Sequence, residues 1–238
     1  MHIFRTLLFG LLTLLTVVPA GAAEKRLTVV ELFTSEGCSS CPPADEFLGD
    51  LARRDDILAL SLHVDYWDYI GWKDPFGDAR FTRRQRDYGD RLRLRYVYTP
   101  QVVVDGAYET VGSDRAQVLA AISRAQALPR VAVRLTGTAS SGMAVELPAA
   151  DVGPVNVYAV FYARHRDSNV RRGENSGRKL SHANVVLDMN RIAEWNGSAT
   201  SIPVAASPRG GDVCAVILQS ASSGHIIGAA RLALDGKS

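Results

Sequence analysis

The chain has 238 residues, of which 47% are hydrophobic and 22% are charged, and its formal net charge is +2. The apolar fraction is enough for a substantial core, and the length allows one large domain or two small ones. The nearly balanced charge favours neither nucleic-acid nor membrane partners, and we expect no nucleic-acid partner.

The N-terminus has the pattern of a secretory signal peptide. A short basic start over 1–5 precedes an uncharged apolar stretch over 6–18 and small residues over 20–23. The apolar stretch is shorter than the roughly 20 residues of a membrane-spanning helix, so an uncleaved anchor is the less favoured alternative. We therefore expect residues 1–23 to be a cleaved signal and the mature chain to be exported, periplasmic or secreted, without stable membrane insertion.

Strand and helix signals alternate through the first half of the mature chain. Apolar runs predict buried strands, and apolar residues at helical spacing predict helices. An aromatic-rich loop follows the second strand, and Asp105-Gly106 between two β runs predicts a hairpin. The predicted elements are a strand over 27–33, a helix over 44–52, a strand over 57–64, a helix over 78–94, a hairpin over 101–111 and a helix over 116–127.

The pattern changes after Pro129, where short strands separated by Gly, Ser, Asn and Pro replace the helices. Such spacing is typical of an antiparallel sheet or a sandwich. The predicted strands cover 131–135, 143–147, 155–164, 180–187, 201–205, 213–219 and 226–234. We therefore predict an α/β domain over 24–129 followed by a β-rich, sandwich-like antiparallel domain over 130–238.

Cys38 and Cys41 form a Cys-x-x-Cys motif between the first predicted strand and the first predicted helix. The start of a helix lowers a thiol pKa, and this spacing lets the second thiol reach the first. Pro42 and Pro43 are tolerated in a helix only in its first turn, so they place the pair at the helix start. Cys38 is the predicted attacking cysteine, and Cys41 the one that resolves a mixed disulfide.

The third cysteine, Cys214, lies in a run of apolar residues that predicts a buried strand. Its favoured interpretation is a buried, inert thiol, and the alternative is a resolving or regulatory partner for the pair. Three cysteines are too few for a disulfide scaffold in an exported chain.

The end of the second predicted strand supplies further candidates, because parallel strands end at the same sheet edge. His63 or Asp65 would tune the thiols or shuttle a proton there. Alternatively, His63 is a satisfied core residue and Asp65 caps a loop. Trp67 and its neighbouring aromatic residues form either a packed cluster or one wall of a substrate groove.

The Thr99-Pro100 bond opens the strand of the predicted hairpin, a position that can carry a cis peptide. The order of elements resembles the thioredoxin fold, in which a cis-proline faces the cysteine pair. This resemblance implies that Pro100 is cis beside Cys38 and that Thr99 offers its backbone to a substrate peptide. The alternative is an ordinary trans proline at a strand entry.

Longer motifs give a closer resemblance. The segments Glu31–Asp45, His63–Phe76, Tyr98–Gln101 and Gly173–Val185 resemble the exported "domain of unknown function 1223" family. The resemblance implies a thioredoxin-like N-terminal domain with a β-rich C-terminal domain, and it supplies no activity. The Gly-Cys-Ser-Ser-Cys centre also departs from the Trp-Cys-Gly-Pro-Cys of thioredoxin, which leaves the direction of electron flow open.

Two polar segments have open interpretations. The segment 80–95 carries seven arginines and forms either a solvated helix face or a basic docking surface. The segment 171–179 is either a mobile loop between strands or a lid that reaches toward the thiol site, with His182 just beyond it.

The leading functional hypothesis is an exported thiol–disulfide oxidoreductase that uses no cofactor and no metal. Its partners would be protein or small-molecule thiols and disulfides, together with a redox partner protein. One alternative is a thiolate metal-binding protein or metallochaperone for Cu(I) or Zn, with His63 as a third ligand. Another is a non-catalytic binding module in which the Cys38–Cys41 disulfide only fastens a turn.

Overall fold

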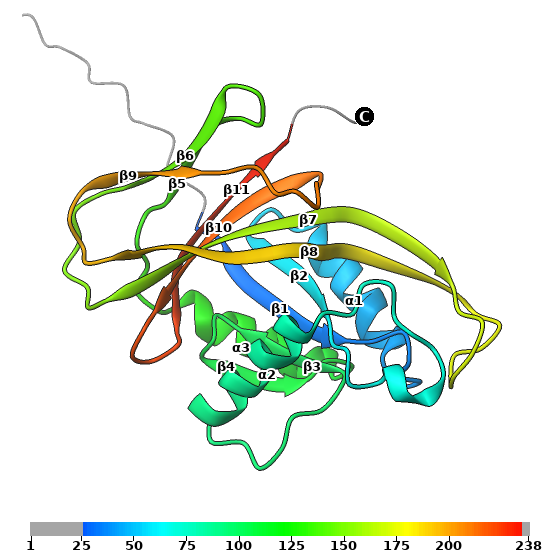
Figure 1. Cartoon of the computed structure of the whole chain (residues 1–238). Helices are drawn as coiled ribbons and strands as arrows, with labels where there is room; N and C mark the ends of the chain where they lie inside the picture. The colour runs from blue at the N-terminus through cyan, green and yellow to red at the C-terminus, as the bar shows by residue number, and fades with distance from the viewer. Residues whose placement is uncertain (1–25, 235–238) are drawn as a thin grey trace, which may run out of the picture.

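The computed structural model describes residues 26–234, so the predicted signal peptide lies outside the described residues. Three helices and a single 3-10 turn belong to the first half of the chain (Figure 1). The elements of this half are β1 (Thr28–Thr34), α1 (Pro42–Ala52), β2 (Ile57–His63), η1 (Asp68–Ile70), α2 (Ala79–Arg91), β3 (Gln101–Val104), β4 (Tyr108–Val111) and α3 (Arg115–Gln126). No helix within 26–234 is long and apolar enough to cross a membrane.

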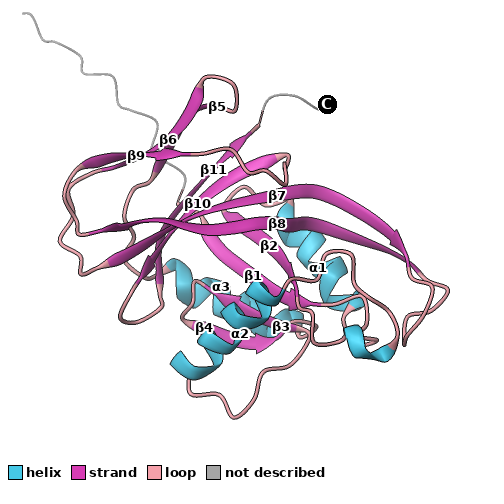
Figure 2. Ribbon diagram, viewed as in Figure 1, coloured by secondary structure: helices cyan, strands magenta, loops and turns pink. Residues whose placement is uncertain are grey.

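Within the described residues, only strands follow α3. They are β5 (Arg134–Thr138), β6 (Gly142–Leu147), β7 (Val155–Asn169), β8 (Lys179–Trp195), β9 (Thr200–Val204), β10 (Val213–Ser220) and β11 (Ile226–Ala233). Figure 2 shows the helices gathered around β1 to β4, with strands making up the rest of the molecule. The described chain is therefore a mixed α/β structure in which the helices belong to the first half.

Strands from both halves share one eight-stranded sheet, in the order β11-β10-β7-β8-β2-β1-β3-β4. β1 runs parallel to β2 and antiparallel to β3, whereas the pairs among β7, β8, β10 and β11 are all antiparallel. The halves join where Ser61 of β2 pairs in parallel with Val185 of β8, and the Asn184 side chain donates to the Ala59 carbonyl at 2.9 Å. The boundary predicted near residue 129 therefore does not separate two sheets.

β1 and β2 lie at the centre of the helical half, and every residue of both strands is buried. Side chains on one face of these strands pack against α1 and α3, and those on the other face pack against α2. Coverage on both faces explains why these strands read as continuous apolar runs rather than as alternating patterns.

A second core lies between two sheets in the strand-rich half. The three-stranded sheet β5-β6-β9 packs its apolar side chains against those of β7, β10 and β11. Cys214 of β10 lies fully buried in this core, and burial raises its pKa to about 12. The predicted buried thiol is confirmed, and its high pKa makes it a poor nucleophile at neutral pH.

The largest difference from the predicted elements concerns β7 and β8. The expected strands over 155–164 and 180–187 extend to 155–169 and 179–195, and they pair along their length. Their shared tip, residues 170–178, projects past α1 (Figure 1). Both faces of this part of the hairpin are partly exposed, so the extensions carry polar residues. Apolar periodicity therefore does not predict them.

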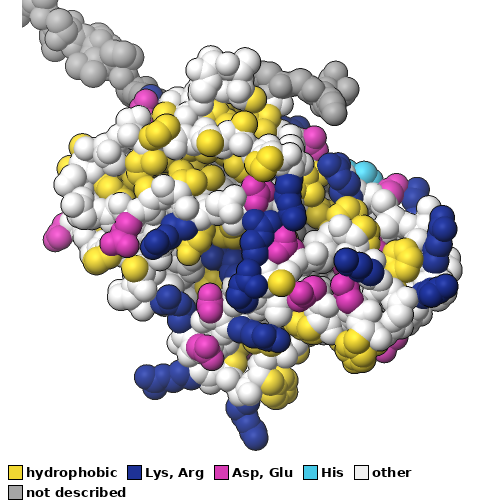
Figure 3. All heavy atoms as spheres, viewed as in Figure 1, with side chains coloured by type: hydrophobic (Ala, Val, Ile, Leu, Met, Phe, Trp, Pro, Cys, Tyr) yellow, Lys and Arg dark blue, Asp and Glu magenta, His cyan; other side chains and the backbone are white. Residues whose placement is uncertain are grey.

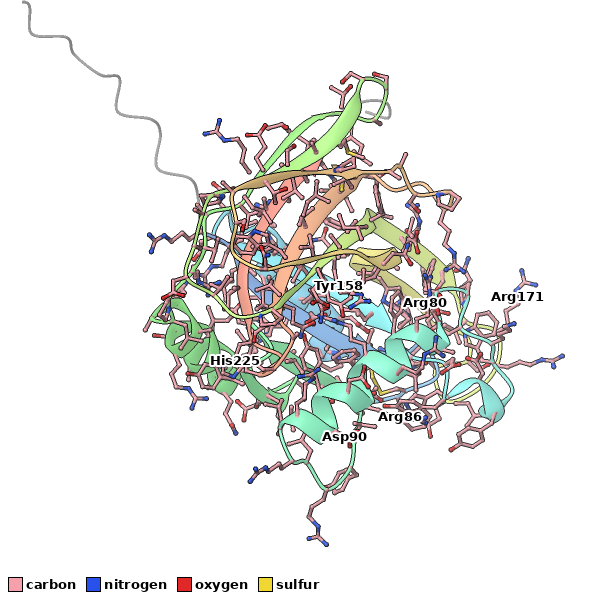
Figure 4. All side chains as sticks on the ribbon, turned by 60° about the vertical axis from the view of Figure 1, so that its left-hand side comes forward. Arg80, Arg86, Asp90, Tyr158, Arg171 and His225 are labelled. Atoms are coloured by element: carbon pink, nitrogen blue, oxygen red, sulfur yellow. A yellow bond between two sulfur atoms is a disulfide. The ribbon has the colours of Figure 1, made fainter. Side chains whose placement is uncertain are left out.

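The interpretation of the arginine-rich segment as a solvated helix face is only partly correct. Arg83 and Arg86 are exposed, and Figure 4 shows Arg86 and Asp90 on the outer side of α2. In Figure 3, Lys and Arg side chains are interspersed with Asp and Glu rather than gathered into a separate patch. Arg84 differs, because its side chain is only 11% exposed and its Nε donates to the buried Glu31 at 2.6 Å.

The Glu31–Arg84 pair attaches α2 to the sheet. Tyr88 also donates to Glu31 at 2.6 Å, and the Arg84 guanidinium lies over the rings of Tyr88 and Tyr158 at 5.0 and 5.3 Å. Multiple hydrogen bonds and ring contacts compensate for the cost of burying these charges. The pair positions α2 against β1 and does not belong to the site described below.

Candidate functional site

The cysteine pair is a disulfide between Cys38 and Cys41, directly after the turn that follows β1. Cys41 is the N-cap of α1, and Pro42 and Pro43 are the first two helical residues. The Cys41 carbonyl accepts hydrogen bonds from the amides of Ala44 and Asp45, at 2.9 and 3.1 Å. The disulfide therefore lies at the helix N-terminus, where the two prolines cost no helical hydrogen bond.

The disulfide is closed off from solvent. Cys38 is 1% exposed and Cys41 is fully buried. The Ser40 hydroxyl lies 3.4 Å from the Cys38 sulfur, and Ser39 and Ser40 themselves are exposed. Solvent thus reaches the turn that carries the cysteines but not the sulfurs.

The tip of the β7–β8 hairpin packs onto this turn. The buried Asn175 amide donates to the carbonyls of Glu36 and Cys38, both at 2.9 Å. Glu174 accepts from the Ser39 amide at 3.1 Å, and hydrogen bonding with Ser39 lowers the pKa of Glu174. Arg171, by contrast, points out into solvent from the same tip (Figure 4). Of the two interpretations of 171–179, these contacts support a segment that reaches the thiol site.

Trp67 connects the cysteine turn to the start of β3. Its indole N–H donates to the Thr99 hydroxyl at 2.8 Å. A Cβ on Gly37 would lie only 2.9 Å from the Trp67 Cβ, so a glycine is needed for this close approach. The Thr99–Pro100 bond is cis, and Pro100 and Ala44 of α1 lie side by side against Gly112. Three predicted candidates, Trp67, Thr99 and Pro100, thus lie around the start of α1.

Asp65 contacts α2 and, among the described residues, shows no hydrogen bond with the cysteine turn, where it was proposed to tune the thiols or shuttle a proton. Its carboxylate accepts from the Thr82 hydroxyl of α2 at 2.5 Å, and its amide donates to the same hydroxyl at 3.2 Å. These bonds fasten the aromatic loop to α2, which matches the alternative in which Asp65 caps a loop. We therefore do not include Asp65 in the site.

His63 is fully buried, and its Nδ1 lies 2.8 Å from Asp74 in the aromatic loop. The same Asp74 oxygen accepts from the Glu36 amide at 2.8 Å, two residues before Cys38. Burial acts to raise the pKa of Asp74, but the charge and hydrogen bond of His63 hold it below its usual value. His63 therefore supports the cysteine turn through Asp74.

A second buried histidine lies beside the first. The rings of His63 and His182 meet edge to face at 4.7 Å. His182 Nε2 lies 3.4 Å from Glu36, and its Nδ1 lies 3.8 Å from Asp45 of α1. Glu36 is fully buried and also accepts hydrogen bonds from Trp72 and Ser168.

These residues, Glu36, Asp45, His63, Asp74 and His182, form the buried acid–histidine cluster. Asp45 Oδ1, His63 Nε2 and both ring nitrogens of His182 form no hydrogen bond of good geometry with a described residue, although Glu36 and Asp45 lie 3.4 and 3.8 Å from the His182 ring. Such a concentration of buried titratable groups makes the cluster a candidate functional site. No three His, Cys, Asp or Glu side chains within 26–234 are arranged to hold a metal ion.

Asp45 is the member of the cluster with the clearest chemical role. Burial raises its pKa to about 7, although the nearby His182 acts to lower it. Asp45 lies four residues after Cys41, and residues at this spacing on a helix share one face. A carboxyl group that gains and loses its proton near neutral pH is thus one helical turn from Cys41.

The raised pKa of Asp45 predicts a stability change with a defined sign. The fold favours the protonated carboxyl, so this group's contribution to stability is lost as pH rises from about 4 to about 7. Asp45→Asn cannot ionise and avoids this loss. At pH 8 the variant should be more stable than the parent by roughly 2–4 kcal/mol, and at pH 4 the two should be nearly equal.

Urea unfolding at the two pH values measures this difference. Asp50→Asn is the matched control, since Asp50 is a more exposed carboxylate on the same helix and lies outside the buried acid–histidine cluster. A stability difference between Asp45→Asn and the parent that is the same at both pH values would contradict the assignment.

The sequence indicated part of this site. His63, Trp67, Thr99 and Pro100 were candidates, whereas Glu36, Asp45 and Asp74 were not. Glu36 is close enough to Cys38 in sequence to have been considered. Asp74 comes from a loop, and no local pattern connects it with the cysteines. His182 was noted only as lying just beyond the segment 171–179 that was proposed to reach the thiol site.

Comparisons with known proteins agree with the motif-level resemblance. The family model described as "Protein of unknown function (DUF1223)" matches residues 29–219. The chain belongs to this family. Its matched region runs from β1 to β10 and so includes the cysteine turn, the buried cluster and the β7–β8 hairpin. No curated protein matches the chain.

Two solved structures are similar to this member of the family. A crystal structure of a protein from Agrobacterium tumefaciens shares 33% identity and a TM-score of 0.76, over 91% of this chain and 98% of that one. HBP35 of Porphyromonas gingivalis shares 16% identity and a TM-score of 0.54, over 91% of this chain and 77% of that one. The second likeness concerns the fold alone.

Proposed function

We propose that this DUF1223 protein is an exported thiol–disulfide oxidoreductase whose helical half is thioredoxin-like. The observation that carries the proposal is the Cys38–Cys41 disulfide at the N-terminus of α1. The cis Thr99–Pro100 bond near that helix start and a carboxyl of raised pKa one turn into α1 support it. Each feature suits disulfide exchange, and together they assign different tasks to the two cysteines.

Cys38 is the exchanging cysteine. The helix N-terminus and the Ser40 hydroxyl, 3.4 Å from its sulfur, stabilise a thiolate at this position. A partner thiolate attacks the Cys38 sulfur, the Cys38–Cys41 bond breaks, and the electron pair of that bond passes to Cys41. The Cys41 thiolate then takes the proton held by Asp45.

A second thiolate of the partner completes the cycle by attacking the partner's sulfur in the mixed disulfide, which releases Cys38. The two partner thiols release two protons when they form thiolates and lose two electrons when they form the disulfide. These protons return to Cys38 and Asp45, so the cysteine pair becomes a dithiol and Asp45 is again protonated. The reverse sequence reduces a partner disulfide. A redox partner protein with its own dithiol or disulfide restores the starting state in either direction.

Burial of both cysteines favours one competing function, a binding module in which the disulfide is purely structural. The reduction potential separates the two. Equilibration of the mature protein with dithiol–disulfide buffers, followed by thiol trapping, should give a two-electron transition between roughly −270 and −120 mV, the range of disulfide-exchanging enzymes.

The double variant Cys38→Ser/Cys41→Ser is the control, because it retains Cys214 and should show no transition. A potential below roughly −300 mV is typical of resistant structural disulfides and would reject the oxidoreductase.

A further inference from the structure

A groove of about 870 Å³ runs along α1 from Pro42, at the end of the helix that carries the disulfide. Its helical wall comprises Pro42, Asp45, Glu46, Gly49, Ala52 and Arg53. This spacing of three or four residues defines one face of α1 over its whole length, about 16 Å at 1.5 Å per residue. Pro42 directly follows Cys41, so one end of the groove adjoins the proposed exchange site.

The opposite wall is the start of β8, where every residue from Arg178 to Asn184 lines the groove. The groove also reaches β7, β10 and β11, where Tyr162, Arg164, Val213, Arg231 and Ala233 line it. At about 3.3 Å per residue, a groove as long as α1 suits an extended peptide of four or five residues.

Cations outnumber carboxyl groups on the walls of the groove. Arg53 and Lys179 are paired with aspartates outside it. The other three cations, Arg164, Arg178 and Arg231, form no ion pair with a described residue, although Arg178 and Arg231 hydrogen-bond to uncharged acceptors. Glu46 is exposed, and Asp45 is partly neutralised by its raised pKa.

His182 also lines the groove, but it is 1% exposed and already has carboxylate neighbours. Its Nε2 lies 3.4 Å from Glu36, and its Nδ1 lies 3.8 Å from Asp45. The cations that remain for a ligand are therefore the three arginines without an ion pair, and these favour an anionic ligand.

We infer that this groove binds an acidic, extended segment of the partner polypeptide, adjacent to the cysteine that exchanges with Cys38. The inference names the substrate class of the proposed oxidoreductase and rests on that function for its role. A small anionic thiol would fill only the end near Pro42 and leave the cations farther along α1 unused. An acidic peptide can place negative charges beside cations along the whole helix, so we favour it over a small anionic thiol.

Binding is testable without any redox chemistry. A fluorescent, thiol-free peptide rich in Glu and an isosteric peptide rich in Gln are titrated with the oxidised protein at low salt, and anisotropy is measured. The Glu peptide should bind at least about ten-fold more tightly, and the difference should shrink above roughly 0.15 M salt. Arg164→Gln should weaken binding of the Glu peptide about three- to five-fold.

Arg83→Gln is the matched control, because Arg83 is an exposed arginine on α2 and does not line the groove. Equal binding of both peptides, or an equal loss in the two arginine variants, would overturn the inference. Displacement of the peptide by millimolar free glutamate would also overturn it, because the site would then take a small carboxylate.

The two proposals fail separately. Charge-selective binding together with a redox-silent disulfide would keep the groove as a peptide site and reject the oxidoreductase. A redox-active disulfide without charge-selective binding would keep the oxidoreductase and reject the acidic peptide.

Discussion

Cys41→Ser is expected to accumulate as a mixed disulfide through Cys38, whereas Cys38→Ser is expected to form none. In the proposed function a partner reaches Cys38 once the turn opens, because Cys38 lies beside the Ser40 hydroxyl and next to the exposed Ser39. Cys41 is fully buried as the N-cap of α1, and its proposed role is to react only with Cys38. Without Cys41, nothing in the protein resolves the bond between Cys38 and its partner.

The measurement uses each variant in reduced form and an aromatic disulfide that releases a coloured thiol. The Cys41→Ser protein should release one equivalent and retain the other half of the reagent, as intact mass shows. The Cys38→Ser protein should react at least about a hundred-fold more slowly. Both variants retain Cys214, which is buried with a pKa raised to about 12, so they control for it.

Equal trapping in the two variants would contradict the assigned order of attack. Trapping confined to Cys38→Ser would reverse the roles of Cys38 and Cys41. Neither result would depend on the direction in which the natural partner drives the exchange.

Asn175→Ala should make the disulfide about 30- to 150-fold faster to reduce by a small phosphine. The Asn175 amide closes the hairpin tip over the cysteine turn through two buried hydrogen bonds of 2.9 Å. Each such bond contributes roughly 1–1.5 kcal/mol, so their loss makes opening easier by about 2–3 kcal/mol. Because both cysteines are buried, opening of the tip precedes attack, and the reduction rate follows its population.

Two further variants calibrate this rate. Glu174→Gln weakens one exposed contact, the 3.1 Å bond from the Ser39 amide, and should accelerate reduction about three-fold or less. Asn156→Ala, at the far end of β7, removes a side-chain oxygen that accepts from the exposed Arg191 and should leave the rate unchanged. A rate in Asn175→Ala equal to that of the parent would show that the tip does not control access.

The position of the cysteine pair followed from the sequence because its determinants are local. An apolar run over 27–33 gave a buried strand, and Pro42 and Pro43 can occupy only the first turn of a helix. The burial of Cys214 followed in the same way from its apolar neighbours. The Thr99–Pro100 bond is cis, as the resemblance to the thioredoxin fold implied.

The element boundaries were less predictable where strands are partly exposed. β7 and β8 continue through polar sequence that has no apolar alternation, so their full length and the reach of their tip were not predicted. Arg84 was grouped with solvated neighbours, although a single buried acid, Glu31 of β1, binds it. Such pairings depend on which elements meet, not on the spacing of residues within one helix.

The sequence by itself determined a Cys-x-x-Cys pair at a helix start, a helical half and a strand-rich half. Only the tertiary structure decided that Asp45, His63 and His182 meet behind that pair, and that Asn175 closes over it. The physical reason is the range of the interactions. Helix capping and apolar runs act between neighbours in the chain, whereas the buried cluster and the closed tip need β8 to pair beside β2 across more than a hundred residues.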